Sequence, residues 1–343
     1  MAQKNGSDLH ISPGYYPTIR VDGRLMPLTN KSVLDSQTLK NMAYASMNEF
    51  QKKRFETEKE VDFSYQPDGN ARFRSNFYLT RGKVAGAFRL IPEQIKTVEE
   101  LNMPPIIKIF SKLSQGFVLI VGPNGHGKTT TMAALINEIN KERAEKIVTI
   151  EDPIEYVFSA EKSIIDQREL GGDTLSFSKA LRSTFRENVN VIMVGEMRDY
   201  ETMSAAVTAD ETGHLVFGTL HTNNAAQTIE RIVDTFPPSQ QQQVIAQLAN
   251  TLSGIVSQRL VPRIRGGLVP ATEILIANPA VRTLIRERKF QQLNLVIDTS
   301  FEAGMSSLNR NLAKLVREKE ISQEQAEFFS LNQDELRELI KDR

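Results

Sequence analysis

The stretch Phe117-Val-Leu-Ile-Val-Gly-Pro-Asn-Gly-His-Gly-Lys-Thr129 decides the fold of this chain of 343 residues. The apolar run Phe117–Val121 predicts a buried strand, and the loop after it satisfies the pattern G-x-x-x-x-G-K-T in full. Apolar residues then recur at helical spacing, which predicts a helix from Lys128 to about Asn140. Strand, glycine loop and helix together indicate a P-loop, which binds nucleotide phosphates at a helix N-terminus.

The chemistry of phosphate binding accounts for the residue types in this loop. Glycines let backbone N–H groups turn toward phosphate oxygens without a Cβ clash. Lys128 is expected to reach the β- and γ-phosphates, and the Thr129 hydroxyl to ligate Mg²⁺. The predicted ligands are therefore ATP and Mg²⁺, and the predicted nucleotide-binding residues are Gly122, Pro123, Asn124, Gly125, His126, Gly127, Lys128, Thr129 and Thr130.

The composition limits the possible partners. Lys plus Arg and Asp plus Glu each number 42, so the formal net charge is zero, which argues against a general nucleic-acid binder. There is no cysteine, which rules out disulfides and cysteine–zinc sites and suits a reducing cytoplasm. The polar start of the chain predicts no signal peptide, and no apolar run approaches the ~20 residues of a membrane span. Any membrane association is therefore expected to go through a protein partner or a surface.

The pattern of elements predicts two domains. Residues 1–100 indicate a small α+β domain, with one helix from Ser36 to about Glu58 and turns at Asp22-Gly23 and Pro67–Asn70. Residues 101–106 form the predicted linker, which ends in a double proline. In residues 107–343 apolar strands alternate with amphipathic helices, which predicts a mainly parallel sheet covered on both faces. After about residue 239 the pattern is mostly helical, apart from a last strand at Val269–Leu275.

Polar residues follow three of the predicted parallel strands, at the edge where the P-loop also lies. Glu196 follows the apolar run Val191–Val194 and takes the place of a Walker-B acid, so we expect it to orient or deprotonate the attacking water. Glu151 and Asp152 are expected to bind Mg²⁺ through its waters or to share the role of base. The predicted metal-site residues are thus Thr129, Asp152 and Glu196. The alternative for these carboxylates is N-capping of the helices that follow.

Two histidines bracket the strand at Leu215–Thr219. His214 and His221 are seven residues apart, which at ~3.3 Å per residue separates them by about 23 Å and excludes a shared metal ion. His221 lies at the carboxyl end and is expected to contact phosphate. His214 lies at the other end and is either structural or works against another subunit.

Three arginines lie on predicted strands of the amino-terminal domain. Arg72 and Arg74 are two residues apart, so they share one face of a strand, and Arg89 lies on the next strand. By themselves they are typical of a solvated sheet face.

The P-loop and three further motifs resemble those of the hexameric secretion ATPases of type IV pili and type II secretion, with the closest likeness to the pilus-retraction branch. The likeness covers nearly the whole chain. The motifs are the acidic box Thr149–Tyr156, the Walker B motif Val194–Asp199 and the histidine box Thr212–Thr222. The segment Ala280–Glu287 is similar to a carboxy-terminal signature of the retraction branch that is associated with retraction rather than ATP turnover, with Arg282 as its central charge.

The resemblance implies a PAS-like domain in residues 1–100 and a RecA-like ATPase domain in residues 107–343. Six subunits are expected to close into a ring with ATP at the interfaces, where Arg72, Arg74 and Arg89 reach phosphate. Arg182 and Arg186 are weaker candidates for that role. The implied function is ATP hydrolysis that powers pilus retraction in the cytoplasm, at the inner face of the membrane, through an inner-membrane platform protein.

Some positions depart from the family pattern, and other functions stay open. Asn124, His126 and Asn190 replace the usual residues, and His126 is expected to alter rate or pH dependence. Val281 and Thr283 depart from the retraction signature. The alternatives are a pilus-extension or type II secretion ATPase, a retraction accessory protein, a nucleic-acid translocase and a scaffold that binds nucleotide without hydrolysis. The short chain without cysteine favours retraction, because extension ATPases usually carry a longer amino-terminal region and often a four-cysteine zinc insert.

Overall fold

The computed structural model describes residues 6–21, 24–67, 71–91 and 94–341. The predicted turn at Asp22-Gly23 and the tip of the predicted turn at residues 68–70 lie outside this range. The chain forms two compact units. The first unit holds residues 1–95, 150–158 and 167–176, and the second holds residues 96–149, 159–166 and 177–343. The segment with the acidic box therefore belongs to the same unit as the amino-terminal residues.

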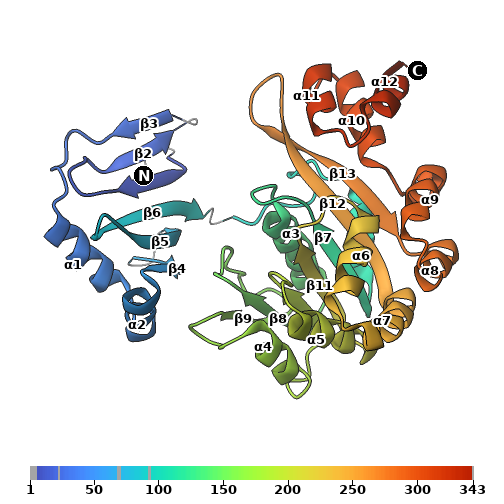
Figure 1. Ribbon diagram of the computed structural model, residues 1–343, viewed down its shortest axis with the longest axis horizontal. Helices are drawn as coiled ribbons and strands as arrows, with labels where there is room; N and C mark the ends of the chain where they lie inside the picture. The colour runs from blue at the N-terminus through green and yellow to red at the C-terminus, as the bar shows by residue number, and fades with distance from the viewer. Residues whose placement is uncertain (1–5, 22–23, 68–70, 92–93, 342–343) are drawn as a thin grey trace. The chain divides into compact units, whose positions relative to one another are not determined.

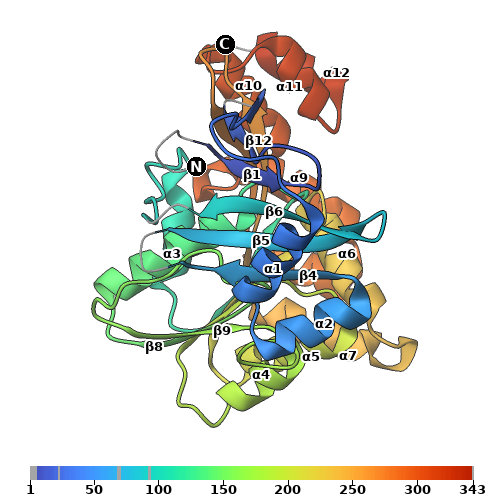
Figure 2. The same ribbon diagram turned by 90° about the vertical axis from the view of Figure 1, so that its left-hand side faces the viewer.

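The first unit is built on a six-stranded sheet in the order β3-β2-β1-β6-β5-β4, with two helices on it (Figure 2). Its strand pairs among the described residues are antiparallel, and the buried Leu39, Phe55 and Phe77 lie in the core with α1 and α2. The elements are β1 (Asp8–Ile11), β2 (Thr18–Val21), β3 (Arg24–Pro27), α1 (Ser36–Ser46), α2 (Glu49–Glu58), β4 (Glu60–Tyr65), β5 (Arg72–Thr80) and β6 (Lys83–Ile91).

The single helix predicted from Ser36 to about Glu58 is wrong, because the structure has two helices there. Met47 ends α1 in an extended conformation, and Asn48 begins α2 as an N-cap whose side chain accepts from the Gln51 N–H. Gln51 closes the capping box by accepting from the Asn48 N–H at 2.9 Å. This reciprocal pair satisfies backbone donors that a new helix leaves open, so the local capping chemistry overrides the continuous apolar pattern.

The second unit contains most of a seven-stranded sheet in the order β13-β12-β7-β11-β10-β8-β9 (Figure 1). Its fully buried strands are apolar along their length, as expected for a sheet covered on both faces. The strands are β7 (Gly116–Val121), β8 (Lys146–Glu151), β9 (Ile164–Glu169), β10 (Val191–Val194), β11 (Leu215–Leu220), β12 (Leu252–Pro262) and β13 (Leu268–Ile276).

Helices connect these strands and complete the unit. The α-helices are α3 (Lys128–Glu142), α4 (Phe177–Thr184), α5 (Tyr200–Glu211), α6 (Ala225–Thr235), α7 (Pro238–Thr251), α8 (Pro279–Arg286), α9 (Leu293–Thr299), α10 (Leu308–Arg317), α11 (Gln323–Phe329) and α12 (Gln333–Lys341). The 3-10 helices are η2 (Pro105–Lys112), η3 (Phe290–Gln292) and η4 (Phe301–Ala303). Among the helices that the structure describes, none is long and apolar enough to cross a membrane.

The strand β12 corrects the expectation of a mostly helical region after about residue 239. It pairs in parallel with β7, directly beside the strand that leads into the P-loop, and antiparallel with β13. Gly266 and Gly267, both with positive φ, lie in the turn of this hairpin. Such a glycine pair between β-branched runs is a hairpin signal. The far end of the hairpin packs on α10 and α11, in a core that includes buried Val261, Val269 and Leu312 (Figure 1).

Candidate nucleotide-binding site

Three parallel strands of the second unit bring the P-loop, the Walker-B acid and the histidine box to one edge of the sheet. In the register of the sheet, Val121 of β7 lies opposite Leu220 of β11, and Val194 of β10 lies opposite Gly218. The residues that follow these strands therefore emerge side by side. This register places His221 and Glu196 near the P-loop, as the sequence predicted.

The first glycine of the P-loop is required by a close approach of β12. A Cβ on Gly122 would lie 2.3 Å from the carbonyl oxygen of Gln258, and its φ is +142°. Only glycine fits both conditions. At the other end of the loop, Gly127 has φ +80° and caps α3, whose N-terminus faces the loop. The loop is thus shaped by its own glycines and by the neighbouring strand.

Lys128 links the loop to two of the predicted catalytic residues, His221 and Glu196. Its Nζ donates to the carbonyl oxygens of Gly122 at 2.8 Å and Pro123 at 2.9 Å, and lies 3.1 Å from Nδ1 of His221. Nε2 of His221 lies 2.9 Å from the Glu196 carboxylate. An ammonium group can only donate, so Nδ1 accepts and Nε2 carries the proton that His221 donates to Glu196. The side chains form one chain of hydrogen bonds across the ends of β7, β11 and β10.

The Glu196 carboxylate is held in its ionised form. Burial by itself favours the neutral acid, but the hydrogen bond and charge of Arg198, together with His221, outweigh it, and the pKa of Glu196 lies below its usual value. Arg198 contacts the same carboxylate oxygen as His221 does. An ionised carboxylate at this position is able to accept a proton from water, as a general base requires.

His126 ties the P-loop to β12. Its Nδ1 accepts from the backbone N–H of Leu260 at 2.8 Å, and its carbonyl oxygen accepts from Nε2 of Gln258 at 2.7 Å. Burial and the positive charges of Arg259 and Lys128 lower the pKa of His126. The imidazole therefore stays neutral and keeps its acceptor for Leu260 near neutral pH.

Sequence reasoning missed the residues that β12 and the Walker B loop contribute. Gln258 and Leu260 hold the loop at His126, and Arg198 sets the charge state of Glu196. The β-branched Ile255, Val256 and Val261 were a strand signal, and the Gly266-Gly267 pair was a turn signal. With β12 recognised, the contact with the P-loop would still have required the strand order.

Glu151 and Asp152 belong to the first unit. Glu151 ends β8 and is buried, and its carboxylate accepts from the Gln167 side chain at 3.2 Å. Asp152 follows it and is exposed. Their predicted roles at Mg²⁺ and as base remain predictions.

The three predicted arginines lie on one sheet face of the first unit. Arg74 of β5 is the cross-strand partner of Arg89 of β6, which is in turn the partner of Asp8 of β1. Like charges opposite each other repel, and carboxylates offset this: Arg89 pairs with Asp8 at 3.0 Å and Arg74 with Glu155 at 3.2 Å.

Arg72 is the most embedded of the three arginines. Its guanidinium donates to Ser64 at 2.6 Å and to the Ile154 carbonyl at 3.3 Å, and lies 3.7 Å from Glu169. Arg72 and Arg74 therefore hold the acidic-box segment on the sheet. Their predicted contact with phosphate remains a prediction.

The oxygen donors of the second unit suit Mg²⁺. Thr129 supplies a partly exposed hydroxyl in the first turn of α3, and Glu196 supplies an ionised carboxylate. In the described part of the chain, no three His, Cys, Asp or Glu side chains are grouped to hold a metal ion. Mg²⁺ usually binds through one or two protein oxygens, waters and substrate phosphates rather than in a protein cage. The residues therefore fit this ion, although they do not form a site of their own.

Two further predicted residues have structural partners. Nδ1 of His214 donates to the Ala209 carbonyl at the end of α5, at 2.8 Å. Arg282 of α8 donates to the last carbonyls of α7, at 2.8 Å to Ala249 and 2.5 Å to Asn250. A cation at a helix C-terminus is favourable for the helix dipole. The retraction-like signature thus caps the helix that leads into β12.

The P-loop, the Walker-B acid and their connecting histidine define a P-loop nucleotide-binding protein. The family model described as type II/IV secretion system protein matches residues 2–323. The chain therefore belongs to this family of secretion and pilus ATPases, as the motifs of the sequence predicted.

Individual relatives are similar over almost their full length. The chain is 46% identical over 325 residues to the type IV pilus retraction ATPase PilT of Pseudomonas aeruginosa, which covers 95% of this chain and 94% of that protein. It is 46% identical over 321 residues to a twitching motility protein of Neisseria gonorrhoeae, with 93% and 86% covered. A crystal structure of the pilus retraction motor PilT with bound ADP superposes with a TM-score of 0.91 at 44% identity, covering 98% and 96%. These matches confirm the predicted ATPase fold with an amino-terminal domain.

Proposed function

We propose that this chain is the subunit of a hexameric ATPase motor that hydrolyses ATP to ADP and phosphate and powers the retraction of a type IV pilus. The observation that carries the proposal is the hydrogen-bonded chain from Lys128 through His221 to Glu196. It joins the phosphate-binding lysine to an ionised carboxylate in one unit. The similarity to pilus retraction ATPases over nearly the whole chain supports the mechanical task.

The residues of the second unit divide the chemistry among them. Lys128 leaves the loop carbonyls to neutralise the β- and γ-phosphates of ATP, while the loop N–H groups hold the anion. Glu196 accepts a proton from the attacking water, whose oxygen forms a bond to the γ-phosphorus as the bond to the ADP oxygen breaks. His221 contacts both Lys128 and Glu196, so a shift of the Lys128 ammonium group changes the hydrogen bond that His221 donates to Glu196. Thr129 and, through water, Glu196 or Asp152 would hold Mg²⁺, which would supply positive charge to the transition state.

The ring and its partners complete the proposal. Arg72, Arg74 and Arg89 of one subunit exchange their carboxylate partners for phosphate at the P-loop of the next subunit. Residues 1–100 and 107–343 act as domains that move against each other and displace an inner-membrane platform protein from the cytoplasmic side. No nucleic-acid partner is expected, since the formal net charge of zero argues against a general nucleic-acid binder.

The first test is ATP turnover against protein concentration, for the wild type alone and mixed with Arg74→Ala or Glu196→Gln chains. We expect specific activity to rise cooperatively with concentration, and each variant to inhibit the mixture beyond its mole fraction. Arg24→Ala is the control, because Arg24 is an exposed arginine on another strand of the same sheet. Activity that is independent of concentration, with variants that only dilute it, would contradict shared sites.

A second test separates retraction from extension. The chain is expressed in cells that lack their retraction ATPase and in cells that lack their extension ATPase. We expect the chain to restore both the removal of pili from the surface and twitching, and to do so only in the first strain. The Glu196→Gln chain should restore neither. Restored pilus assembly in the second strain would instead identify an extension motor, and binding of DNA at physiological salt would point to a translocase.

A further inference from the structure

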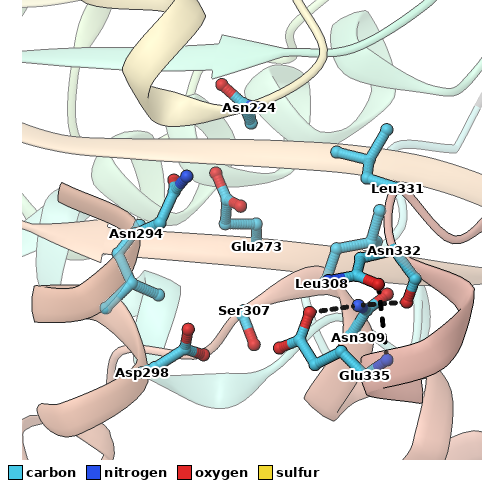
Figure 3. Close-up of a pocket in the computed structure, with 11 residues that line it drawn as sticks. Asn224, Glu273, Asn294, Asp298, Ser307, Leu308, Asn309, Leu331, Asn332 and Glu335 are labelled. Atoms are coloured by element: carbon cyan, nitrogen blue, oxygen red, sulfur yellow. Dashed lines mark hydrogen bonds between the residues drawn. The ribbon is translucent and has the colours of Figure 1, made fainter. Parts of the chain in front are cut away.

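A polar cavity of about 360 Å³ lies in the second unit, among α6, β13, α9, α10 and α12 (Figure 3). A cavity of this volume is within the range of small-molecule sites. Every residue that lines it belongs to the stretch from Asn224 to Glu335. None of the predicted nucleotide-binding or catalytic residues is among them, so this site is distinct from the P-loop.

The charges of the lining have one sign. Among the described residues, three carboxylates line the cavity, from Glu273, Asp298 and Glu335, and no Lys, Arg or His does. Arg310 forms an ion pair with Asp298 at 3.8 Å, too long for a hydrogen bond, and the Asp298 side chain is 33% exposed. The guanidinium of Arg259, on the neighbouring strand β12, donates to the Phe329 carbonyl and to the Asn223 side chain. Neither nearby arginine therefore donates a hydrogen bond to the cavity carboxylates.

Two of the carboxylates keep acceptor capacity that the protein does not use. Glu273 is only 7% exposed, and its one hydrogen bond is at Oε1, from the Ala225 N–H at 2.7 Å. Figure 3 shows its carboxylate pointing into the cavity between Asn224 and Asn294. Oδ1 of Asp298 and Oγ of Ser307 are buried without a hydrogen bond. Buried polar groups are normally satisfied, so these atoms call for a donor.

The size and shape of the site decide between kinds of donor. A metal ion would need grouped ligands, and among the described residues no three His, Cys, Asp or Glu side chains are grouped in that way. A single water occupies only about 30 Å³ of liquid volume, far less than the cavity offers. An organic cation with several N–H donors matches both the volume and the separated carboxylates.

We propose that this cavity binds an organic ammonium or guanidinium cation, with Glu273 and Asp298 as its charged ligands. The source of the cation is either a free amine or a Lys or Arg side chain of a second copy of the chain. The site borders the loop after β11, because Glu273 accepts from Ala225, four residues beyond His221. A bound cation therefore contacts the base of the loop that carries this histidine.

The test is calorimetric titration of the full-length protein with 1,4-diaminobutane, without nucleotide because amines also bind ATP. We expect saturable binding of one molecule per chain, weakened at least tenfold in Glu273→Gln and in Asp298→Asn. Glu273→Gln keeps the acceptor for Ala225, and Asp298→Asn provides an independent variant if the first does not fold. Glu324→Gln, an exposed carboxylate on α11, is the control and should bind like the wild type.

A neutral ligand of the same length tests the role of charge. 1,4-Butanediol should not bind measurably, since it lacks the positive charge. Absent diamine binding, equal binding of the diol, or diamine binding that neither cavity variant weakens would overturn the proposal. Absence of ATPase activity would not affect it, because the titration contains no nucleotide.

The pH dependence provides an independent check. Burial, the charge of Asp298 from α9 and the Ala225 N–H of α6 act on Glu273 together with Arg259 of β12, and burial dominates and raises the pKa of Glu273 to about 7. A cation prefers the ionised carboxylate, so diamine affinity should rise between pH 6 and pH 8 in the wild type. In Glu273→Gln that rise should be lost. A wild-type affinity that is flat over this range would count against Glu273 as the ligand.

Sedimentation velocity with and without the diamine assigns the source of the cation. If a side chain of a second copy fills the cavity, the free amine competes with it and the assembled species decreases, as it also does in Glu273→Gln. If the natural ligand is a free amine, the assembly is unchanged. Either result is compatible with the cation site, and together with the titration it identifies the occupant.

Discussion

Glu196 contacts His221 and Glu273 contacts Ala225, at the two ends of one short segment, and their pKa values are shifted in opposite directions although burial raises both. Glu196 shares its carboxylate with Arg198 and His221, and its pKa lies below the usual value. Glu273 has one backbone N–H as its donor, and burial raises its pKa to about 7. Glu196 is also less buried than Glu273, so the difference shows that the depth of burial and the partners of a carboxylate together decide its charge.

The same difference in charge state distinguishes the nucleotide-binding site from the cavity around Glu273. A base for water must be ionised before the substrate arrives, and Arg198 and His221 maintain that state at Glu196. Glu273 has no cationic hydrogen-bond partner in the described chain, so its ionisation is favoured only when a cation enters.

The largest expected effect is on ATP turnover in Glu196→Gln. The amide keeps the shape and the contact with His221 but cannot accept a proton, so kcat should fall by about 10²–10⁴-fold. Nucleotide affinity should change little, because Lys128 and the loop remain. Steady-state turnover and equilibrium binding of a fluorescent nucleotide measure the two quantities separately.

The control for this variant is Glu201→Gln, an exposed carboxylate in the first turn of α5 that follows the same loop. It should leave kcat within about twofold of the wild type, as expected for a surface site. If Glu196→Gln retained full turnover, the base would have to be another group, and Glu151 is the next candidate.

The second prediction concerns the stability of Glu273→Gln at different pH values. The unfolded chain loses this proton near the ordinary pKa, whereas the folded chain holds it until about pH 7. The wild type therefore loses stability as pH rises from about 5 to 8, and the variant should gain about 2 kcal/mol relative to it over that range. Urea unfolding at pH 5 and pH 8 measures the gain.

Two other carboxylates serve as references for that measurement. Asp210 also has a pKa raised to about 7 by burial, but it is present in both proteins and cancels in the difference. Glu324→Gln on the surface of α11 should show no pH-dependent gain. A constant difference between wild type and Glu273→Gln at both pH values would mean that Glu273 is already ionised at pH 5, as Glu196 is.

The third prediction concerns His126, a partly buried side chain that burial and nearby positive charges keep neutral. Replacing it with Leu leaves the Leu260 N–H without its acceptor, which should lower the free energy of unfolding by about 1–2 kcal/mol. His126→Asn is the matched variant, because its Oδ1 can take the place of Nδ1, and it should retain most of the stability. Chemical unfolding of both variants at pH 8 makes the comparison.

The same pair predicts a pH effect of opposite sign to that of Glu273. Because the pKa of His126 is lowered in the folded state, the unfolded chain takes up the proton first on acidification. The wild type should therefore lose stability relative to His126→Asn as pH falls below about 6.5. An unchanged difference between pH 8 and pH 5.5 would contradict the acceptor role of Nδ1.

The sequence predicted the catalytic edge better than the cavity, for a physical reason. Lys128, Glu196 and His221 follow strands of a parallel sheet, and the parallel arrangement alone places them at one edge. Glu273 lies within β13, and its neighbours come from four helices whose packing no local pattern specifies. Likewise, the contact of His126 with Leu260 depends on β12 lying next to β7, which is a matter of strand order.

The smallest expected effect is also the most direct test of why the two carboxylates differ. Arg198→Ala removes the first cationic partner of Glu196, so the pKa of Glu196 should rise and the acidic limb of the kcat profile should move to higher pH. The arginine side chain is 76% exposed, so solvent screens it and the shift should stay below about one pH unit. Turnover between pH 5 and pH 9 measures the limb, and added salt should move the wild-type profile toward that of the variant.

Arg198→Lys keeps the charge and should keep most of the wild-type profile. If Arg198→Ala left the acidic limb in place, His221 alone would maintain the ionised Glu196, and the difference from Glu273 would rest on a single hydrogen bond from an imidazole rather than on a cation.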